Sequence, residues 1–322
     1  MKSRVAGSGF FSSLAGRIVV IVVIVAFVVV DVLLVAAALR ATAPVDPGTP
    51  GPIPTYTSSP QPTATASASA AIDEPSGEVR LLSAVSATEA WRTTPGLCGG
   101  AAPKVERSTD GGDTWAVVDL GSTGVADAVA LNAGSDRTAL AGHLTGSCTK
   151  TKAMATFTEG KFWAASTTDV ADLAFVVRGS NRVHLASGVV AGPCATPLGA
   201  VQSGSAAAVS CADAFAVKNG DAAWQTVTVD GLLGFTATGT GTASSYLLAV
   251  DSASDDCDGV AIESLTADLT PDSVPTPVGC APVASAAGTL DPSTVALSRV
   301  GANVWLWAGS RVSVSADGGA SW

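Results

Sequence analysis

The sequence predicts an all-β domain built from internal repeats over residues 78–322, preceded by an apolar segment and a Pro/Thr/Ser-rich linker. Short alternating or β-branched runs are separated about every 8–12 residues by Gly, Asn, Asp or Ser, as in sheets with tight turns. A strand–turn–strand pattern recurs in this region, and a short motif ending in Trp recurs with it. These observations favour a stack of small sheets over a helical architecture.

Residues 18–39 have the length and composition of a transmembrane helix. They consist of Val, Ile, Leu, Ala and Phe, with Asp31 as the one charged residue. At about 1.5 Å per residue the segment spans about 33 Å, enough for a bilayer core. Three basic residues precede it, and after Arg40 the next basic residue is Arg80. The positive-inside rule therefore places residues 1–17 in the cytoplasm and everything beyond Arg40 outside it.

A cleaved signal peptide is the alternative for this segment, with cleavage near the alanines at 36–38. We favour an uncleaved anchor because the apolar run exceeds a signal-peptide core of about 7–15 residues. Asp31 is either tolerated among its apolar neighbours or paired with a polar group of a partner helix. Residues 40–77 contain too little apolar surface to fold, and we expect a disordered stalk there.

Charge and cysteine usage exclude several classes of partner. Residues 78–322 hold 13 Lys and Arg against 23 Asp and Glu, and an acidic surface repels phosphate backbones, so we expect no nucleic acid partner. The six cysteines form no CxxC or Cys/His metal spacing. Outside the cytoplasm an even number of scattered cysteines indicates disulfides. We expect neither a metal nor a cofactor.

The internal repeat is clearest between residues 127–141 and 172–186, which align without gaps at an offset of 45. Both segments predict a strand, a tight turn containing Gly and Asp or Asn, and a second strand. Residues 294–308 have the same form.

A sharper motif, Ser-x-Asp-x-Gly-x-x-Trp, occurs at 108–115 and 315–322. At these residues the chain resembles the Asp-box (BNR-repeat) β-propellers, a group that includes sialidases, sortilin-type receptors and photosystem assembly factors. The resemblance implies a turn between a blade's third and fourth strands, fastened by side chains and remote from any ligand site. The structural residues it implies are Ser108, Asp110, Gly112, Trp115, Ser315, Asp317, Gly319 and Trp322.

Degenerate copies of the motif at 156–163 and 217–224 set the expected number of blades. The closing tryptophans fall at positions 115, 163, 224 and 322, with gaps of 48, 61 and 98 residues. Taking the last gap as two repeats predicts a β-propeller of five four-stranded blades, with an eroded copy near 272–278.

Proximity within the repeats gives a preferred disulfide pairing among 15 alternatives. We expect four cysteines to follow the second strands of successive repeats and to gather on one face. The preferred pairs are Cys98–Cys148, Cys194–Cys211 and Cys257–Cys280.

No set of residues predicts a catalytic site. The sialidase resemblance would require an arginine triad and a Tyr/Glu nucleophile pair, but Tyr246 is the domain's one tyrosine, and Arg137 and Arg182 accompany tight turns. The acidic run at 251–258 could bind calcium together with backbone carbonyls, but its spacing fits no EF-hand loop, and we interpret it as an acidic turn beside Cys257. The two histidines, at positions 143 and 184, are interpreted as packing residues.

The chain stops at Trp322, where the motif would open a fourth strand. Either residues 78–85 pair with strand 311–315 to close the ring, or the ring is incomplete and Trp322 is partly exposed. We expect a membrane-anchored scaffold that binds protein or glycan at the cell surface. The alternative is a cell-surface carbohydrate-active hydrolase with a pair of carboxylates.

Overall fold

The computed structural model describes residues 29–31, 79–166, 173–238, 245–251, 257–266, 268–283 and 290–322. The chain divides into two units, Met1–Ser67 and Ala68–Trp322. In the first unit Val29, Val30 and Asp31 are helical, and the remainder of the predicted anchor and stalk lies outside the described residues. Within the described residues no helix has the length and apolar character needed to cross a membrane.

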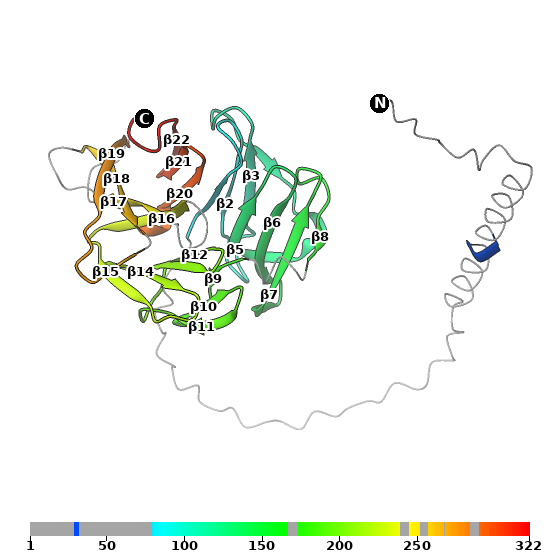
Figure 1. The fold of residues 1–322 in the computed structure, drawn as a ribbon. Coiled ribbons are helices and arrows are strands. Elements are labelled where there is room, and N and C mark those ends of the chain that lie inside the picture. The colour runs from blue at the N-terminus through cyan, green and yellow to red at the C-terminus, as the bar shows by residue number, and fades with distance from the viewer. Residues whose placement is uncertain are drawn as a thin grey trace, which may run out of the picture. The chain divides into compact units, whose positions relative to one another are not determined.

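In the second unit the described residues form six antiparallel sheets, which we call blades 1 to 6 in chain order. Figure 1 shows them following one another around a ring, with the last blade beside the first. This arrangement is a β-propeller.

Blade 1 contains β1 (Leu81–Ala84), β2 (Ala90–Thr94), β3 (Lys104–Ser108) and β4 (Ala116–Val118). Blade 2 contains β5 (Val125–Ala133), β6 (Thr138–Leu144), β7 (Ser147–Thr156) and β8 (Ala164–Ala165). Blade 3 contains β9 (Phe175–Val176), β10 (Arg182–Leu185) and β11 (Gly188–Ala191). Blade 4 contains β12 (Gly199–Ser203), β13 (Ala206–Ser210), β14 (Ala214–Asn219) and β15 (Gln225–Thr228). Blade 5 contains β16 (Leu232–Thr238), β17 (Ser245–Asp251), β18 (Gly259–Thr266) and β19 (Thr276–Pro282). Blade 6 contains β20 (Val295–Val300), β21 (Asn303–Ala308) and β22 (Arg311–Ser315).

The predicted number of five blades is wrong, because the spacing of tryptophans concealed blade 3. The 61-residue gap between Trp163 and Trp224 holds the short strands of blade 3 as well as blade 4. Blade 3 has three described strands and no turn ending in Trp, so it left no mark in the motif spacing. The longer gap before Trp322 holds blades 5 and 6, as expected, and the eroded copy near 272–278 precedes and overlaps β19.

Blade 6 packs against blade 1, so the two ends of the ring meet, but the predicted pairing of residues 78–85 with strand 311–315 is wrong. β1 pairs with β2 as the first strand of blade 1, and β22 pairs with β21. Neither strand pairs with the other in the described part of the chain. Instead the Ala84 backbone N–H donates to Ser298 Oγ at 2.9 Å, and Trp305 Nε1 donates to the Ser86 carbonyl oxygen at 3.0 Å. Trp322 is partly exposed.

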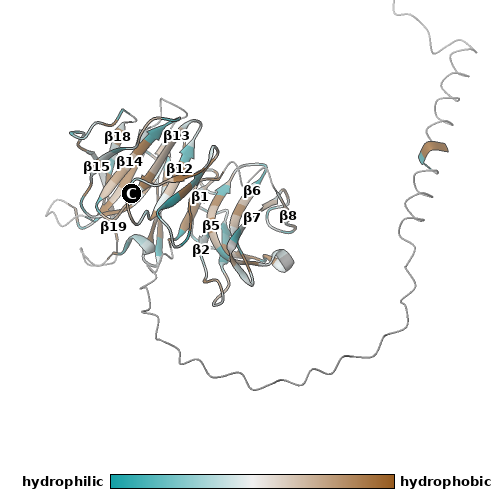
Figure 2. Ribbon diagram, turned by 90° about the horizontal axis from the view of Figure 1, so that it is seen from below, coloured by the Kyte–Doolittle hydropathy of each residue, from teal (hydrophilic) through white to brown (hydrophobic). Residues whose placement is uncertain are grey.

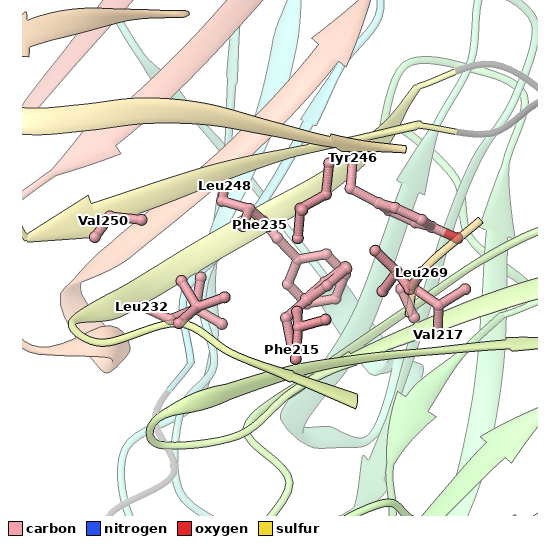
Figure 3. Close-up of a cluster of buried hydrophobic side chains, with 12 residues drawn as sticks. Phe215, Val217, Leu232, Phe235, Tyr246, Leu248, Val250 and Leu269 are labelled. Atoms are coloured by element: carbon pink, nitrogen blue, oxygen red, sulfur yellow. The ribbon is translucent and has the colours of Figure 1, made fainter. Parts of the chain in front are cut away.

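The hydrophobic core lies between adjacent blades, because alternate residues of a strand face opposite sides of its sheet. Figure 2 shows the hydrophobic residues, in brown, along the strands of the ring. One cluster joins blades 4 and 5 (Figure 3), where Phe215 packs edge-on against Phe235 and Tyr246 with ring centroids 5.1 Å apart in both pairs. Burial raises the pKa of Tyr246 to about 12. These interfaces stack the blades around the ring.

Candidate functional site

The turn between β3 and β4 is held by its own side chains. Ser108 Oγ donates to Asp110 Oδ1 at 2.8 Å and accepts the Gly112 backbone N–H at 2.9 Å. The Asp110 carboxylate accepts the backbone N–H of Thr114 at 3.0 Å and also its hydroxyl. Trp115 Nε1 donates to the Gly112 carbonyl oxygen at 3.0 Å. The hydrogen-bonding groups of the motif residues are therefore satisfied within the eight residues of the turn itself.

The chain after β22 repeats this geometry atom for atom. Ser315 Oγ donates to Asp317 Oδ1 at 2.7 Å and accepts the Gly319 backbone N–H at 2.9 Å. Asp317 accepts the backbone N–H and the hydroxyl of Ser321, and Trp322 Nε1 donates to the Gly319 carbonyl oxygen. Two turns at opposite ends of the domain sequence thus use the same residue types in the same roles.

Hydrogen bonding fixes the charge state of both aspartates. The hydroxyl and backbone N–H of Thr114 lower the pKa of Asp110 to about 2. Ser321 lowers the pKa of Asp317 to about 2 in the same way. A carboxylate whose acceptor positions are occupied by its own turn is poorly suited to donate or receive a proton near neutral pH.

The turn glycine is required by its conformation and its neighbours. Gly112 has φ +93°, and a Cβ there would lie 3.3 Å from Trp305 and Val312 of blade 6. Gly319 has φ +100° and would contact Ile262 of blade 5. Each turn therefore packs its backbone on the preceding blade, where L-residues other than Gly do not fit without strain.

Blade 2 builds the same turn from different residues. Thr156 Oγ1 accepts the Gly160 backbone N–H at 3.0 Å, and Thr158 Oγ1 accepts the Phe162 backbone N–H at 2.9 Å. Glu159 has φ 57° at the position where the other two turns have a first glycine. Its carboxylate pairs with Arg107 of blade 1 at 2.8 Å. Threonine hydroxyls thus replace the serine and aspartate of the motif.

The junction between blades 6 and 1 is built from arginine and tryptophan side chains. The Arg92 guanidinium carbon lies 4.1 Å from the ring centre of Trp115 and 4.8 Å from that of Trp307. Arg80 lies over Trp307 at 4.4 Å and donates to backbone carbonyl oxygens of blade 6. Arg92 also pairs with Glu106 at 2.8 Å. Each cation–π contact contributes about 0.5–2 kcal/mol, so the stack strengthens ring closure.

A buried ionic cluster joins blade 2 to the turn after β9 in blade 3. Asp127 and His143 are each 3% exposed. Asp127 Oδ1 lies 2.7 Å from His143 Nδ1, and Arg178 donates to Oδ2. Burial raises the pKa of Asp127, but the hydrogen bonds from His143 and the charges facing it outweigh burial, so the pKa is lowered. Since Asp127 and His143 lie in blade 2 and Arg178 in blade 3, the cluster fastens the two blades together.

The three disulfides pair as the sequence predicts: Cys98–Cys148, Cys194–Cys211 and Cys257–Cys280. The first links blade 1 to blade 2, the second links the segment after β11 to blade 4, and the third lies within blade 5. One detail of the prediction is wrong, because Cys194 follows the third strand of its blade and not the second.

The remaining candidate residues are the acidic run, His184 and Glu263. The acidic run at 251–258 lies largely outside the described residues, and within the described part of the chain no His, Cys, Asp and Glu side chains group as metal ligands. His184 stacks on Phe175 with ring centroids 4.5 Å apart. Burial raises the pKa of Glu263, which lies on β18, the third strand of blade 5.

An open cavity of about 220 Å³ lies between blades 4 and 5. Apolar side chains on its wall include Val217 and Leu269, and Asn219 and Asp268 add polar groups. Asn219 Oδ1 is buried and has no hydrogen-bond partner in the described structure. Figure 3 shows the Tyr246 hydroxyl at the same end of the buried cluster as Val217 and Leu269. The wall of the cavity therefore combines apolar and polar side chains.

Comparisons with known proteins do not assign this chain to a family. No family model matches the chain, and no curated protein matches it. Among solved structures it is similar to YCF48 from Cyanidioschyzon merolae, with 15% identity and a TM-score of 0.29 over 74% of this chain and 66% of that one. It is also similar to an Aleuria aurantia lectin, with 10% identity and a TM-score of 0.42 over 75% of this chain and 96% of that one. A third similar structure is the GH74 enzyme of Niastella koreensis, with 10% identity and a TM-score of 0.33 over 74% of this chain and 36% of that one. The chain thus spans just under two thirds of the YCF48 structure, and the fold assignment rests on its own six sheets.

Sequence reasoning missed the blade junction and the buried ionic cluster. Their members are far apart in the sequence: Arg80 and Gly309 are separated by 229 residues, and Asp127 and Arg178 by 51. A weak signal existed for the cluster, since Asp127 is the one charged residue in the otherwise uncharged strand Val125–Ala133. Such a carboxylate, when buried, needs a partner.

Proposed function

We propose that the chain is a membrane-anchored, extracytoplasmic scaffold that binds or assembles protein or glycan partners on the loop faces of an Asp-box propeller. The supporting observation is the use of the motif residues. Ser108, Asp110, Trp115 and their counterparts in blade 6 satisfy their own turns and pack on the preceding blade. They serve the ring as fasteners, which leaves the loop faces available to partners.

The sequence supports the location. Residues 18–39 would anchor the domain, residues 40–77 would hold it away from the bilayer, and the distribution of basic residues places the domain outside. Three disulfides agree with an oxidising compartment.

A carbohydrate-active hydrolase is the second candidate, and Glu263 is the observation in its favour. Burial raises the pKa of this carboxyl group, as a general acid requires. A hydrolase also needs a second carboxylate about 5–9 Å away. Asp127 and Glu106, two buried carboxylates, are instead held by cationic partners. Loss of glycan hydrolysis in a Glu263→Gln variant would establish this second function.

The first experiment tests topology in intact spheroplasts. Added protease should degrade the domain of the full chain while a cytoplasmic marker survives, and protection of the domain would contradict the proposal. The second experiment cross-links the full chain in native membranes and identifies captured proteins by mass spectrometry. As the matched control, a form with residues 1–40 replaced by a cleavable signal peptide should be released from the membrane.

A further inference from the structure

The turn of blade 2 carries two phenylalanines that its geometry does not require. Phe157 and Phe162 are 70% and 76% exposed. At the equivalent positions blade 1 has threonine twice and blade 6 has alanine and serine, and both of those turns close with the same backbone hydrogen bonds. Two exposed aromatic rings on one turn are unfavourable in water unless a partner covers them.

This turn and the cavity between blades 4 and 5 lie on the same face of the ring. In blade 2, Thr156 begins the turn and pairs with Thr138, the residue that follows the turn between the first and second strands. In blade 4, Asn219 pairs with Ala206, which likewise follows the turn between the first and second strands of its blade. From blade 5 through blades 6 and 1 to blade 2, each turn glycine packs on the preceding blade, so these blades share one orientation. The cavity itself joins this end of blade 4 to the same end of blade 5.

The turn and the rim of the cavity carry opposite charges. The turn presents Lys161 next to Phe162, and the cavity presents exposed Asp268 next to Leu269. A lysine ammonium has three N–H donors and no acceptor, so it can donate to the exposed carboxylate of Asp268. An aromatic ring beside it would cover the apolar wall.

We propose that two copies of this chain associate face to face about a twofold axis, with Phe162 and Lys161 of each copy seated in the cavity of the other. Because the projecting turn and the cavity lie on one face, a single twofold rotation makes both contacts at once. Phe157 contributes apolar area beside the seated ring. This self-association goes beyond the proposed scaffold role, since it requires no ligand and holds whichever partner the loop faces bind.

The first test measures the oligomeric state of the full chain in detergent micelles by sedimentation velocity over a range of concentrations. The wild-type chain should reach a dimer, and the Phe157→Ser/Phe162→Ser variant should have a dissociation constant raised about tenfold or more. The matched control is Thr109→Ser/Thr114→Ser in blade 1, which retains both hydroxyls and should dimerise as the wild type does. A wild-type chain that stays monomeric throughout would overturn the proposal.

The second test exchanges the charges. Lys161→Asp and Asp268→Lys should each weaken the dimer about tenfold, and the double variant should regain wild-type association, which no folding defect could produce. If the double variant is as weak as the single ones, the pairing is refuted. The form with residues 1–40 replaced by a cleavable signal peptide is also sedimented with phosphatidylcholine vesicles, with and without the two phenylalanine substitutions. Lost vesicle binding with unchanged dimerisation would make the turn a lipid contact and would overturn the proposal as well.

Discussion

Replacing Trp305 with alanine should destabilise the whole propeller, because this side chain closes the ring. Trp305 is fully buried, donates from Nε1 to the Ser86 carbonyl oxygen at 3.0 Å, and packs edge-on against Trp115 with ring centroids 6.4 Å apart. Removing a buried tryptophan costs about 3–5 kcal/mol. In a domain of this size about 1 kcal/mol corresponds to 2–4 °C. The melting temperature should therefore fall by about 6–20 °C.

The measurement is thermal unfolding of the full chain followed by circular dichroism, with the disulfides intact. Trp91→Ala provides the comparison, since Trp91 is 2% exposed and packs edge-on against Trp163 at the junction of blades 1 and 2. In a closed ring the two variants should lose similar stability. A fall of less than about 2 °C for Trp305→Ala alone would show that blade 6 does not bury this residue against blade 1.

Three further outcomes are expected. NMR titration should find the carboxyl pKa of Asp110 and Asp317 at about 2. Because these values lie below those of the unfolded chain, the two carboxylates stabilise the fold fully above about pH 4, and this stabilisation is lost as the pH falls towards 2. Ordinary aspartate pKa values would refute the turn hydrogen bonds. Asp127→Asn should lower the free energy of unfolding in urea by about 3–5 kcal/mol, because it leaves the partners of a buried carboxylate without their counter-charge, and a change below about 1 kcal/mol would contradict this role. Alkylation of the native chain should modify no cysteine before reduction and six after it. A cysteine modified before reduction would show that its disulfide is not formed.

The parts of the structure that were predictable depend on local sequence. The turn at 108–115 could be predicted because its hydrogen bonds join residues at most four positions apart. The disulfide pairing followed from separations of 17, 23 and 50 residues within or between neighbouring repeats.

The missed parts depend on packing between distant segments. Blade 3 was not counted because its strands are short and no tryptophan ends its turn. The stack of Arg80 and Arg92 on Trp307 exists because the two ends of the domain meet, and no pattern within one repeat specifies that meeting. The exposure of Phe162 could not be predicted either, because it becomes informative only beside the equivalent turns of blades 1 and 6, which keep the same hydrogen bonds without an aromatic residue there.

The closed six-bladed ring is tested most directly by pulsed electron–electron spin resonance between spin labels on three equivalent turns. Thr88, Ser135 and Ala302 are exposed and lie in the turns between the first and second strands of blades 1, 2 and 6. In a closed ring blade 1 is the neighbour of both blade 2 and blade 6, so the Thr88–Ala302 distance should be similar to the Thr88–Ser135 distance. A Thr88–Ala302 distance that is much longer than the Thr88–Ser135 distance would show that the first and last blades do not meet.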